Sequence, residues 1–375
     1  MVGDAVGRRA RVLASAPMIR RCAIALVHCA TAAAVAAQDA DATAGARDTG
    51  AWIERLAVRD TQRDVVQQLV RLGPAALPVL HRALGDRRPE VVCAALFACS
   101  ALPGDVESLR EPLLRHLHHR DLGIALAARD AWPVLDGRGR TLVADYQAGA
   151  VLEIAADGVA HELAHEPMVM SASRLVDGNL LVAAYQAGRV IEHAPGGAVV
   201  WSCDGLLQPS DAERLPDGHT LIADSGNQRV IEVDARGEIV WTYAHDIRPI
   251  DVDRLGNGDT LIASYHASGC VEVDPHGEVV WQWPSHNVRD ADRLCDGTTL
   301  LVLPDEHKVA LVRSDKTIAR EWRIPFDADD AQLLANGHLL AAGEGWVMEW
   351  NAAGDEVWKA PVRYAGRVAR LGVAR

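Results

Sequence analysis

Residues 211–243 read DAERLPDGHTLIADSGNQRVIEVDARGEIVWTY. This stretch predicts four short strands, at 211–215, 220–223, 229–233 and 238–243. The segment PDG at 216–218 has the composition of a tight turn in which the glycine takes a positive φ. Residues 229–233 (RVIEV) are rich in β-branched side chains, which favour strands. The stretch therefore indicates a small antiparallel sheet.

The same pattern recurs along the chain with a period close to 40 residues. The leucine before each Asp-Gly or Asn-Gly turn recurs at steps of 40, 40, 39 and 40, and a tryptophan recurs on the fourth strand. Four antiparallel strands in such a repeat are typical of a β-propeller blade. The two series are Leu175, Leu215, Leu255, Leu294 and Leu334, and Trp201, Trp241, Trp281, Trp322 and Trp358.

A sixth set of strands at 141–163 lacks a clear first strand. One candidate is DAWPVL at 130–135, and the other is RVARLG at 367–372, which is in phase with DVDRLG at 251–256. We favour the second, because a C-terminal tail at 366–372 that closes the first blade leaves no free sheet edge. The sequence thus predicts an all-β six-bladed propeller of four-stranded blades over residues 132–375.

The chain begins with features of an export signal. Basic residues precede an apolar run from Cys22 to Ala37, which ends in small residues. We predict a signal peptide over 1–37 with cleavage near Ala36 or Ala37, a polar linker over 38–49, and a secreted or periplasmic protein. The start codon is open between Met1 and Met18. The apolar run is too short for a stable membrane span, and a net charge of −13 argues against nucleic acid as a partner.

Residues 50–131 have helical rather than β periodicity. Val65, Val66, Leu69 and Val70 recur at helical spacing, and Gly73 followed by proline separates two helices. The stretch RLGPAALPVLHRALGDRRPEVVCAALFACSAL resembles HEAT-type repeats, which implies antiparallel helix pairs and a partner-binding surface. The predicted fold class is therefore multidomain, with a small all-α HEAT-like domain before the propeller.

The repeat over 211–241 also resembles the blades of arylsulfotransferase-like, PQQ-binding-like and NHL-type propeller proteins. The resemblance implies a propeller of related blades, with any chemistry at the central funnel. For a sulfotransferase it implies a histidine nucleophile just before the first-strand aspartate. In this chain those positions are Ser210, Ile250, Arg289 and Asp329.

Four residues before the aligned leucine, most repeats carry an aspartate. Equivalent positions of a ring converge on its axis, so we expect Asp211, Asp251, Asp290, Asp330 and Arg367 around one mouth of the channel. The four aspartates form a candidate metal site, for Ca²⁺ or another divalent cation, since such ions prefer oxygen ligands. The favoured alternative is that each aspartate accepts backbone N–H groups and ties one blade to the next. No cofactor is assured.

The loops between the second and third strands open on the same face. Three of these loops carry a tyrosine, although the whole chain contains only five tyrosines. Aromatic side chains beside amide and imidazole groups make a surface for a sugar or a peptide, although each tyrosine is equally expected to cover its own hairpin. The predicted ligand-binding residues of this funnel face are Tyr146, Gln147, Tyr185, Gln186, Tyr265, His266, His307 and Arg367.

These features favour an exported binding protein that recognises a ligand, protein or glycan at the funnel face. The alternative is a propeller enzyme, arylsulfotransferase-like or a lactonase- or esterase-like hydrolase, that uses the aspartate ring with or without a metal ion. Whether the protein is an enzyme is left open by the sequence, because it contains no catalytic motif of the metalloprotease, serine hydrolase or nucleotide-binding type.

Overall fold

The computed structural model describes residues 48–103, 107–136, 139–265 and 269–371. The chain divides into two units, Met1–Arg47 and Asp48–Arg375, and all of the described residues belong to the second. The predicted signal peptide at 1–37 lies outside the described residues. Among the helices that are described, none is both long and apolar enough to cross a membrane.

Helices occupy the first part of this unit. The side chain of Asp48 caps the first helix by accepting a hydrogen bond from the backbone of Ala51 at 3.1 Å, and Gly73 ends the second with a φ of +57°. Pro89 starts the fourth α-helix at a position where its missing N–H costs nothing. The helices are α2 (Thr49–Leu56), α3 (Arg59–Leu72), α4 (Leu77–Ala83), α5 (Pro89–Ser100), α6 (Glu107–His116) and α7 (Leu122–Asp136), with the 3₁₀ turn η1 (Gly73–Ala76) between α3 and α4.

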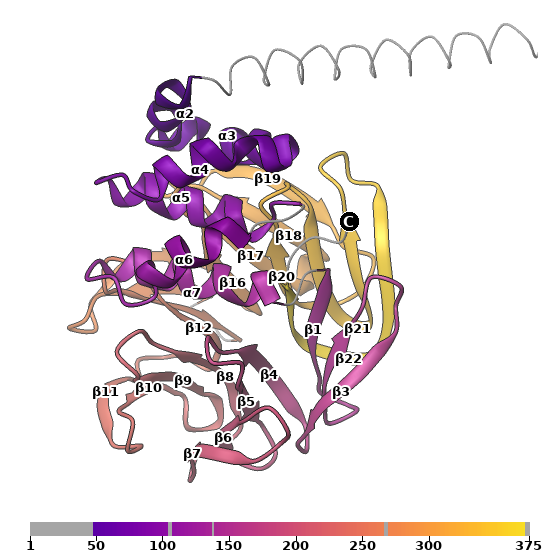
Figure 1. The fold of residues 1–375 in the computed structure, drawn as a ribbon. Helices are drawn as coiled ribbons and strands as arrows, with labels where there is room; N and C mark the ends of the chain where they lie inside the picture. Colours follow the sequence, from indigo (N-terminus) through magenta and orange to yellow (C-terminus); the bar gives the residue numbers. More distant parts are fainter. Residues whose placement is uncertain (1–47, 104–106, 137–138, 266–268, 372–375) are drawn as a thin grey trace, which may run out of the picture. The chain divides into compact units, whose positions relative to one another are not determined.

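The rest of the described chain consists of strands β1 to β22 with their turns and two 3₁₀ turns, η2 (Ser225–Asn227) and η3 (Pro304–Glu306), and every strand pairing is antiparallel (Figure 1). Four sheets have four strands each, and the strands near residues 211–243 lie within two residues of the predicted bounds. The four sheets are β4 (Val169–Arg174), β5 (Leu180–Ala184), β6 (Arg189–His193) and β7 (Val199–Cys203); β8 (Pro209–Arg214), β9 (Thr220–Asp224), β10 (Arg229–Val233) and β11 (Ile239–Tyr243); β12 (Pro249–Arg254), β13 (Thr260–Ser264), β14 (Cys270–Val273) and β15 (Val279–Trp283); β16 (Asp290–Arg293), β17 (Thr299–Leu303), β18 (Lys308–Val312) and β19 (Ile318–Arg323).

The fifth sheet has six strands and contains both ends of the strand region. Its order is β20 (Ala328–Leu333), β21 (Leu339–Trp350), β22 (Glu356–Leu371), β1 (Arg140–Asp145), β2 (Ala150–Ile154) and β3 (Ala160–His165). In this order, β22 pairs with β21 through its first part and with β1 through its last part. Because β21 and β22 are 12 and 16 residues long, they join the last repeat and the first into one sheet.

The predicted number of six blades is therefore wrong: the described residues form five sheets, and so a five-bladed propeller. Spacing in the sequence counts repeats, whereas the sheets are defined by hydrogen bonds. In the other repeats a loop separates two successive strands at these points, whereas β21 and β22 continue as single strands.

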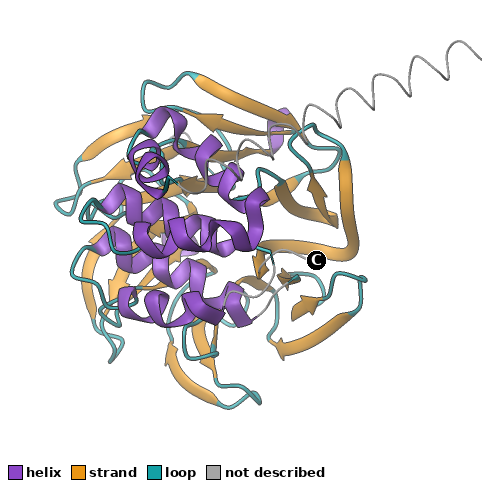
Figure 2. Cartoon of the chain, turned by 45° about the horizontal axis from the view of Figure 1, so that its top comes forward, coloured by secondary structure: helices purple, strands orange, loops and turns teal. Residues whose placement is uncertain are grey.

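The helices cover one end of the propeller. In Figure 2 they lie together in front of the strands, and the contacts show that they touch the turns between the first and second strands of successive repeats. Arg63 donates a hydrogen bond to Thr298 at 2.7 Å and pairs with Asp296, and Gly123 packs on Gly256. Further contacts are Arg129 with the carbonyl of Pro216 at 3.2 Å, Trp132 with the carbonyl of Val176 at 2.9 Å, and Gln67 with Gly337.

This arrangement does not support the expected HEAT-like domain. A HEAT module stacks helix pairs on one another as a domain of its own. Here α4 has only seven residues, and the core of the helices includes Ala335 together with the partly buried Val176 and Cys295 of the propeller turns. The helices and the strands form one compact unit over 48–375.

Neighbouring repeats are joined by a recurring group of three side chains. The arginine at the end of a first strand lies over the tryptophan on the outer strand of the preceding repeat, and pairs with a glutamate on the third strand of that repeat. Arg214, for example, is 4.5 Å from the ring centroid of Trp201 and 2.8 Å from Glu192. The other copies are Arg254 with Trp241 and Glu232, Arg293 with Trp281 and Glu272, and Arg370 with Trp358 and Glu349.

One junction replaces this polar group with apolar side chains. Trp322 packs with Leu311 and Leu333, which stand where the other repeats have glutamate and arginine, and all three are buried in one cluster. An arginine–glutamate pair and a pair of leucines can therefore each fill the space between the outer-strand tryptophan and the next repeat.

Candidate ligand-binding site

The aspartate ring, Asp211, Asp251, Asp290 and Asp330, joins the first strands to one another. Each of these buried carboxylates accepts a hydrogen bond from a backbone N–H of the next first strand. The donors are Val252 at 3.3 Å, Ala291 at 3.1 Å, Ala331 at 3.2 Å and, for Asp330, Val368. The repeated aspartate thus satisfies a backbone donor that the inner strand would otherwise leave unpaired.

Arg367 of β22 lies among these carboxylates. Its guanidinium pairs with Asp251, with Asp290 at 3.3 Å and with Asp211 at 3.9 Å. Burial raises the pKa of Asp251 to about 7, while the positive charge of Arg367 opposes the rise. A guanidinium therefore lies among the four carboxylates that the sequence proposed as metal ligands, and the metal site stays a prediction. Arg367 itself acts as the counter-ion of the ring.

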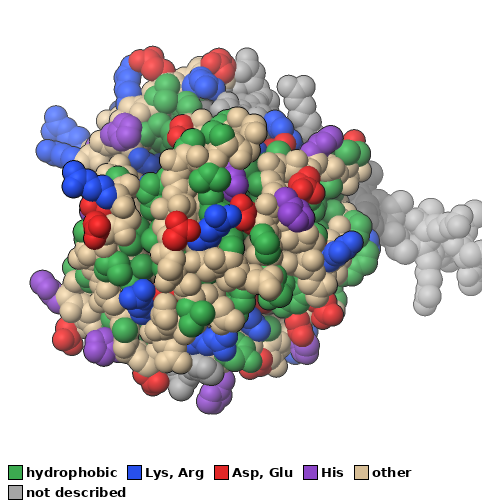
Figure 3. Space-filling view, turned by 90° about the horizontal axis from the view of Figure 1, so that it is seen from below, with side chains coloured by type: hydrophobic (Ala, Val, Ile, Leu, Met, Phe, Trp, Pro, Cys, Tyr) green, Lys and Arg blue, Asp and Glu red, His purple; other side chains and the backbone are tan. Residues whose placement is uncertain are grey.

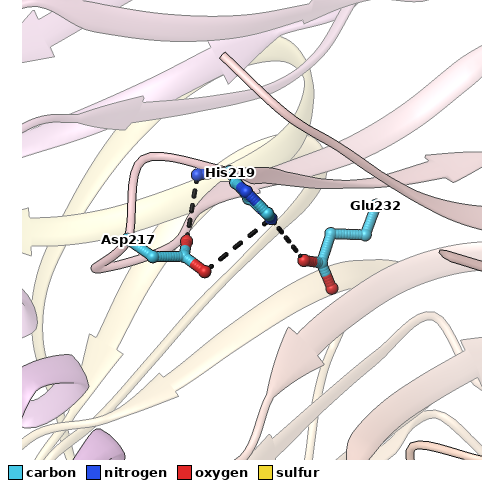
Figure 4. A group of neighbouring side chains, drawn as sticks. All are labelled: Asp217, His219 and Glu232. Carbon is cyan, nitrogen blue, oxygen red and sulfur yellow. Dashed lines mark hydrogen bonds and ion pairs between the residues drawn. The ribbon is translucent and has the colours of Figure 1, made fainter. Parts of the chain in front are cut away.

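Another group of ligating side chains lies in a turn of the second four-stranded sheet (Figure 4). Nδ1 of His219 is 2.7 Å from Glu232 and 3.7 Å from Asp217, and these three are the group within the described ranges whose ligand atoms all lie within 4.8 Å of one another. Asp217 also accepts a hydrogen bond from the backbone of His219 at 3.0 Å. The same turn contact recurs at Asp177, Asn257, Asp296 and Asn336, so it belongs to the repeat.

The residue just before each ring position lies on a β-bulge. In β8, for example, Pro209 pairs with Asp224 and Asp211 pairs with Ala223, so Ser210 is the extra residue between them. Similar register shifts occur at Met170, Ile250, Asp329 and Gly366. Arg289 donates its backbone N–H to the carbonyl of Val302, the residue that Asp290 also faces. A bulge turns its side chain away from the regular pleat.

These six bulge residues converge on the axis. We call them the bulge ring: Met170, Ser210, Ile250, Arg289, Asp329 and Gly366. All six line one small cavity of about 10 Å³, which is the space of a single water molecule, and Arg367 with its neighbouring aspartates forms the floor. The aspartate ring repeats one residue type, whereas every member of the bulge ring is different.

Two polar groups of the bulge ring retain unused hydrogen-bonding capacity. A guanidinium nitrogen of Arg289 is 3.5 Å from Oδ1 of Asp329. The Nε of Arg289 and Oδ2 of Asp329 are buried and have no hydrogen-bond partner among the described residues. Burial raises the pKa of Asp329, while the charge on Arg289 and the nearby hydroxyl of Tyr364 oppose this rise. Because only 6% of Asp329 is exposed, its unpaired oxygen is available mainly to a group that enters the cavity.

Two tyrosines lie next to members of the bulge ring, Tyr265 beside Arg289 and Tyr364 beside Asp329, and two more lie close to Tyr364 or to each other. The rings of Tyr146 and Tyr185, from neighbouring loops, meet edge to face with centroids 5.8 Å apart, and Tyr364 lies 6.0 Å from Tyr146. Tyr265 is 38% exposed, and the guanidinium groups of Arg289 and Arg248 lie 5.1 and 5.7 Å from its ring centroid. We call Tyr146, Tyr185, Tyr265 and Tyr364 the tyrosine rim.

The remaining predicted residues of the funnel face lie farther out in the loops. Gln147 and Gln186 are exposed, and His307 is exposed with its Nδ1 3.2 Å from Asp327. His266 lies outside the described residues. The face shown in Figure 3 carries acidic and basic side chains next to one another rather than in separate patches.

A second acidic layer lies deeper in the channel, toward the helices. It consists of Glu213, Asp253 and Asp292, two positions beyond the aspartate ring on their strands. Burial raises the pKa of Glu213 and of Asp292 to about 8, and Asp130 of α7 adds to both shifts. Glu213 accepts a hydrogen bond from the backbone of Arg254 at 2.8 Å. The ion pairs of the described residues include no arginine that stands within this layer as Arg367 stands within the aspartate ring.

Solved structures of other proteins are similar to this chain, whereas sequence comparisons find no match. No family model and no curated protein matches this chain. A protein of unknown function from Bacteroides caccae is similar in structure, with a TM-score of 0.53 and 17% identity over 61% of this chain and 97% of that one. A chain of the nidogen/laminin complex has a TM-score of 0.52 and 11% identity over 61% and 97%. Virginiamycin B lyase from Staphylococcus aureus has a TM-score of 0.47 and 14% identity over 60% and 81%.

The chain has a β-propeller fold with NHL-like neighbours. At these identities the similarity shows the fold alone. The arylsulfotransferase-like and HEAT-like parts of the resemblance are not confirmed.

Sequence reasoning identified the aspartates but did not select the bulge ring. In the sequence, Ser210, Ile250, Arg289 and Asp329 stand out only as positions that lack the histidine of a sulfotransferase. The sequence does contain one sign of this site. The residue before the ring aspartate differs in every repeat, while the aspartate itself is retained in four of them. Tyr364 was missed because it lies outside the three aligned loops, and Arg248 because its contact with Tyr265 crosses two loops.

Proposed function

We propose that this chain is an exported binding protein that captures a ligand at the axial mouth formed by the bulge ring and the tyrosine rim. The observation that carries the proposal is the convergence of six different bulge residues on one cavity. A scaffold position repeats its residue type, as the aspartate ring does, whereas a recognition site needs different groups in defined places.

The covered end of the propeller supports this choice of mouth. The helices contact the turns at the other end of the channel, at Val176, Pro216, Gly256, Asp296 and Gly337. The bulges stand at the opposite ends of the first strands, beside the loops that carry the tyrosines. A ligand that approaches along the axis therefore meets the bulge ring first.

The hydrogen bonds of the Ser210 hydroxyl favour a binding protein over an enzyme that uses this serine as a nucleophile. Oγ of Ser210 is 3.1 Å from the carbonyl of Pro249 and 3.4 Å from that of Ala223, so its proton is directed to backbone oxygens. An activated serine would instead donate to a general base. Because the N-terminal pattern predicts export, we propose a ligand that the protein meets outside the cytoplasm.

A thermal-shift screen of the mature protein tests the proposal. The library contains oligosaccharides, short peptides and small metabolites, and a ligand present at 100 times its Kd stabilises the fold by about 2.7 kcal/mol. Ile250→Trp fills the mouth, and Val280→Trp places the same side chain on an outer strand where Val280 is 54% exposed.

We expect ligands that raise the melting temperature of the wild type and of Val280→Trp but not of Ile250→Trp. Equal shifts in both variants, or no ligand in the library for the wild type, would contradict a binding site at this mouth. The melting temperatures without ligand show whether both variants are folded.

A further inference from the structure

We infer that the ligand of the axial mouth is a neutral saccharide. One of its hydroxyl groups bonds to both Arg289 and Asp329, and its ring stacks on Tyr265. This inference rests on the proposed function and specifies its ligand.

The charges of the mouth favour a neutral ligand. Arg289 and Asp329, the charged pair that lines the cavity, are 3.5 Å apart and compensate each other. A phosphate or carboxylate group would be repelled by Asp329, and an ammonium group or metal ion by Arg289. A ligand without net charge avoids both costs.

The unpaired hydrogen-bonding groups require a donor and an acceptor side by side. Nε of Arg289 is an unused donor and Oδ2 of Asp329 is an unused acceptor among the described residues, and both are buried at the same cavity. A hydroxyl group serves as donor and acceptor. A single hydroxyl of a sugar ring, accepting from Arg289 and donating to Asp329, would satisfy both groups.

The cavity itself limits what can enter. Its volume of about 10 Å³ admits a single hydroxyl-sized group, so the ring of the ligand must lie outside, among the loops. There Tyr265 is 38% accessible, beside the guanidinium groups of Arg289 and Arg248, and the apolar side chains of Met170 and Ile250 border the opening. A sugar ring has apolar C–H faces that stack on tyrosine and a polar edge that points into the cavity.

The experiment measures the binding of neutral oligosaccharides to the mature protein by isothermal titration calorimetry and saturation-transfer NMR. The probes are maltopentaose, cellopentaose, xylopentaose, mannopentaose and chitopentaose, and a mixture of uncharged hexapeptides is the comparison. Asp329→Asn keeps the shape of the side chain, but it removes the negative charge and replaces one carboxylate oxygen with an NH₂ group that can only donate. Tyr265→Ala removes the ring and Tyr265→Phe keeps it. Asp157→Asn is the matched control in an exposed turn, where the carboxylate of Asp157 accepts a hydrogen bond from the backbone of Val159 at 3.0 Å.

We expect at least one oligosaccharide to bind the wild type, Asp157→Asn and Tyr265→Phe alike. Asp329→Asn and Tyr265→Ala should each weaken this binding about 10-fold or more, since the first leaves a buried polar group unpaired and the second removes the stacking surface.

Three results would overturn the inference. If no oligosaccharide binds while uncharged peptides bind in a manner that depends on Ile250, the saccharide is wrong and the binding function stands. If neither class binds, both fail. If a saccharide binds equally well to Asp329→Asn and Tyr265→Ala, its site lies elsewhere. Far-ultraviolet circular dichroism of each variant checks the fold.

Discussion

The guanidinium of Arg367 pairs with the carboxylate of Asp251, a residue 116 positions earlier in the chain. Arg367 lies in the last strand, so the positive charge that compensates the aspartate ring comes from the end of the propeller. The ring is therefore complete only when β22 has paired with β1.

Removal of this charge should destabilise the propeller. Arg367→Met leaves the buried carboxylates of the aspartate ring without a counter-ion, and we expect the free energy of unfolding at pH 7 to fall by about 3–5 kcal/mol. Urea titration followed by tryptophan fluorescence measures the change. The loss should shrink at pH 5, where more of these carboxylates are protonated, and a loss that is the same at both values would contradict the electrostatic explanation.

The same geometry predicts how the protein responds to Ca²⁺. In the wild type Arg367 stands among the ring carboxylates, so we expect neither Ca²⁺ nor a chelator to change the melting temperature. In Arg367→Met the oxygens become available, and millimolar Ca²⁺ should raise the melting temperature. A stoichiometric divalent ion in the wild type, found by elemental analysis and lost with stability on chelation, would show instead that the aspartates form a metal site.

The junctions between repeats predict a double-mutant cycle. Arg214→Leu removes the cation that pairs with Glu192 and leaves this largely buried carboxylate only the amide of Asn179, so the change should cost about 1–3 kcal/mol. The double variant Arg214→Leu with Glu192→Leu reproduces the apolar junction of Trp322, Leu311 and Leu333, and should recover at least half of that loss. Urea unfolding of the four proteins measures the coupling. Additive losses would mean that the charged pair and the leucine pair are not equivalent solutions.

The second acidic layer predicts a dependence on pH. The pKa of Glu213 and of Asp292 is raised by burial to about 8, so the folded state binds protons that the unfolded state has already released. This contribution to stability is complete below the unfolded pKa of these groups and is lost as the pH rises to about 8. Glu213→Gln with Asp292→Asn should therefore unfold with a smaller loss of stability between pH 5 and pH 8 than the wild type. Parallel curves for the two proteins would contradict the shifted pKa values.

The sequence predicted the parts of this molecule that repeat. The leucine and tryptophan series predicted the four-stranded units, and the recurring aspartate marked residues that do lie next to the axis. The number of sheets could not be obtained in this way. Whether Gly345 or Gly366 ends a strand depends on hydrogen bonds to neighbours far away in the chain, and β21 and β22 continue through both positions.

The proposed recognition site was hidden for a related reason. A β-bulge is a matter of register, and nothing in the local composition of Pro209, Ser210 and Asp211 shows which residue is the extra one. The helical cover was equally inaccessible, because the contact between Gly123 and Gly256 joins two glycines that sequence periodicity treats as separate turns.

Hydroxyl-radical footprinting tests most directly whether the ligand occupies the bulge ring. The wild type is oxidised with and without the strongest ligand of the thermal-shift screen, and modified residues are located by mass spectrometry. We predict that oxidation of Met170 and Tyr265 falls several-fold when the ligand is bound, while oxidation of Trp281 on the outer strand β15 is unchanged. Protection of Trp281 or of the helices with no change at Met170 and Tyr265 would contradict a ligand site at the axial mouth.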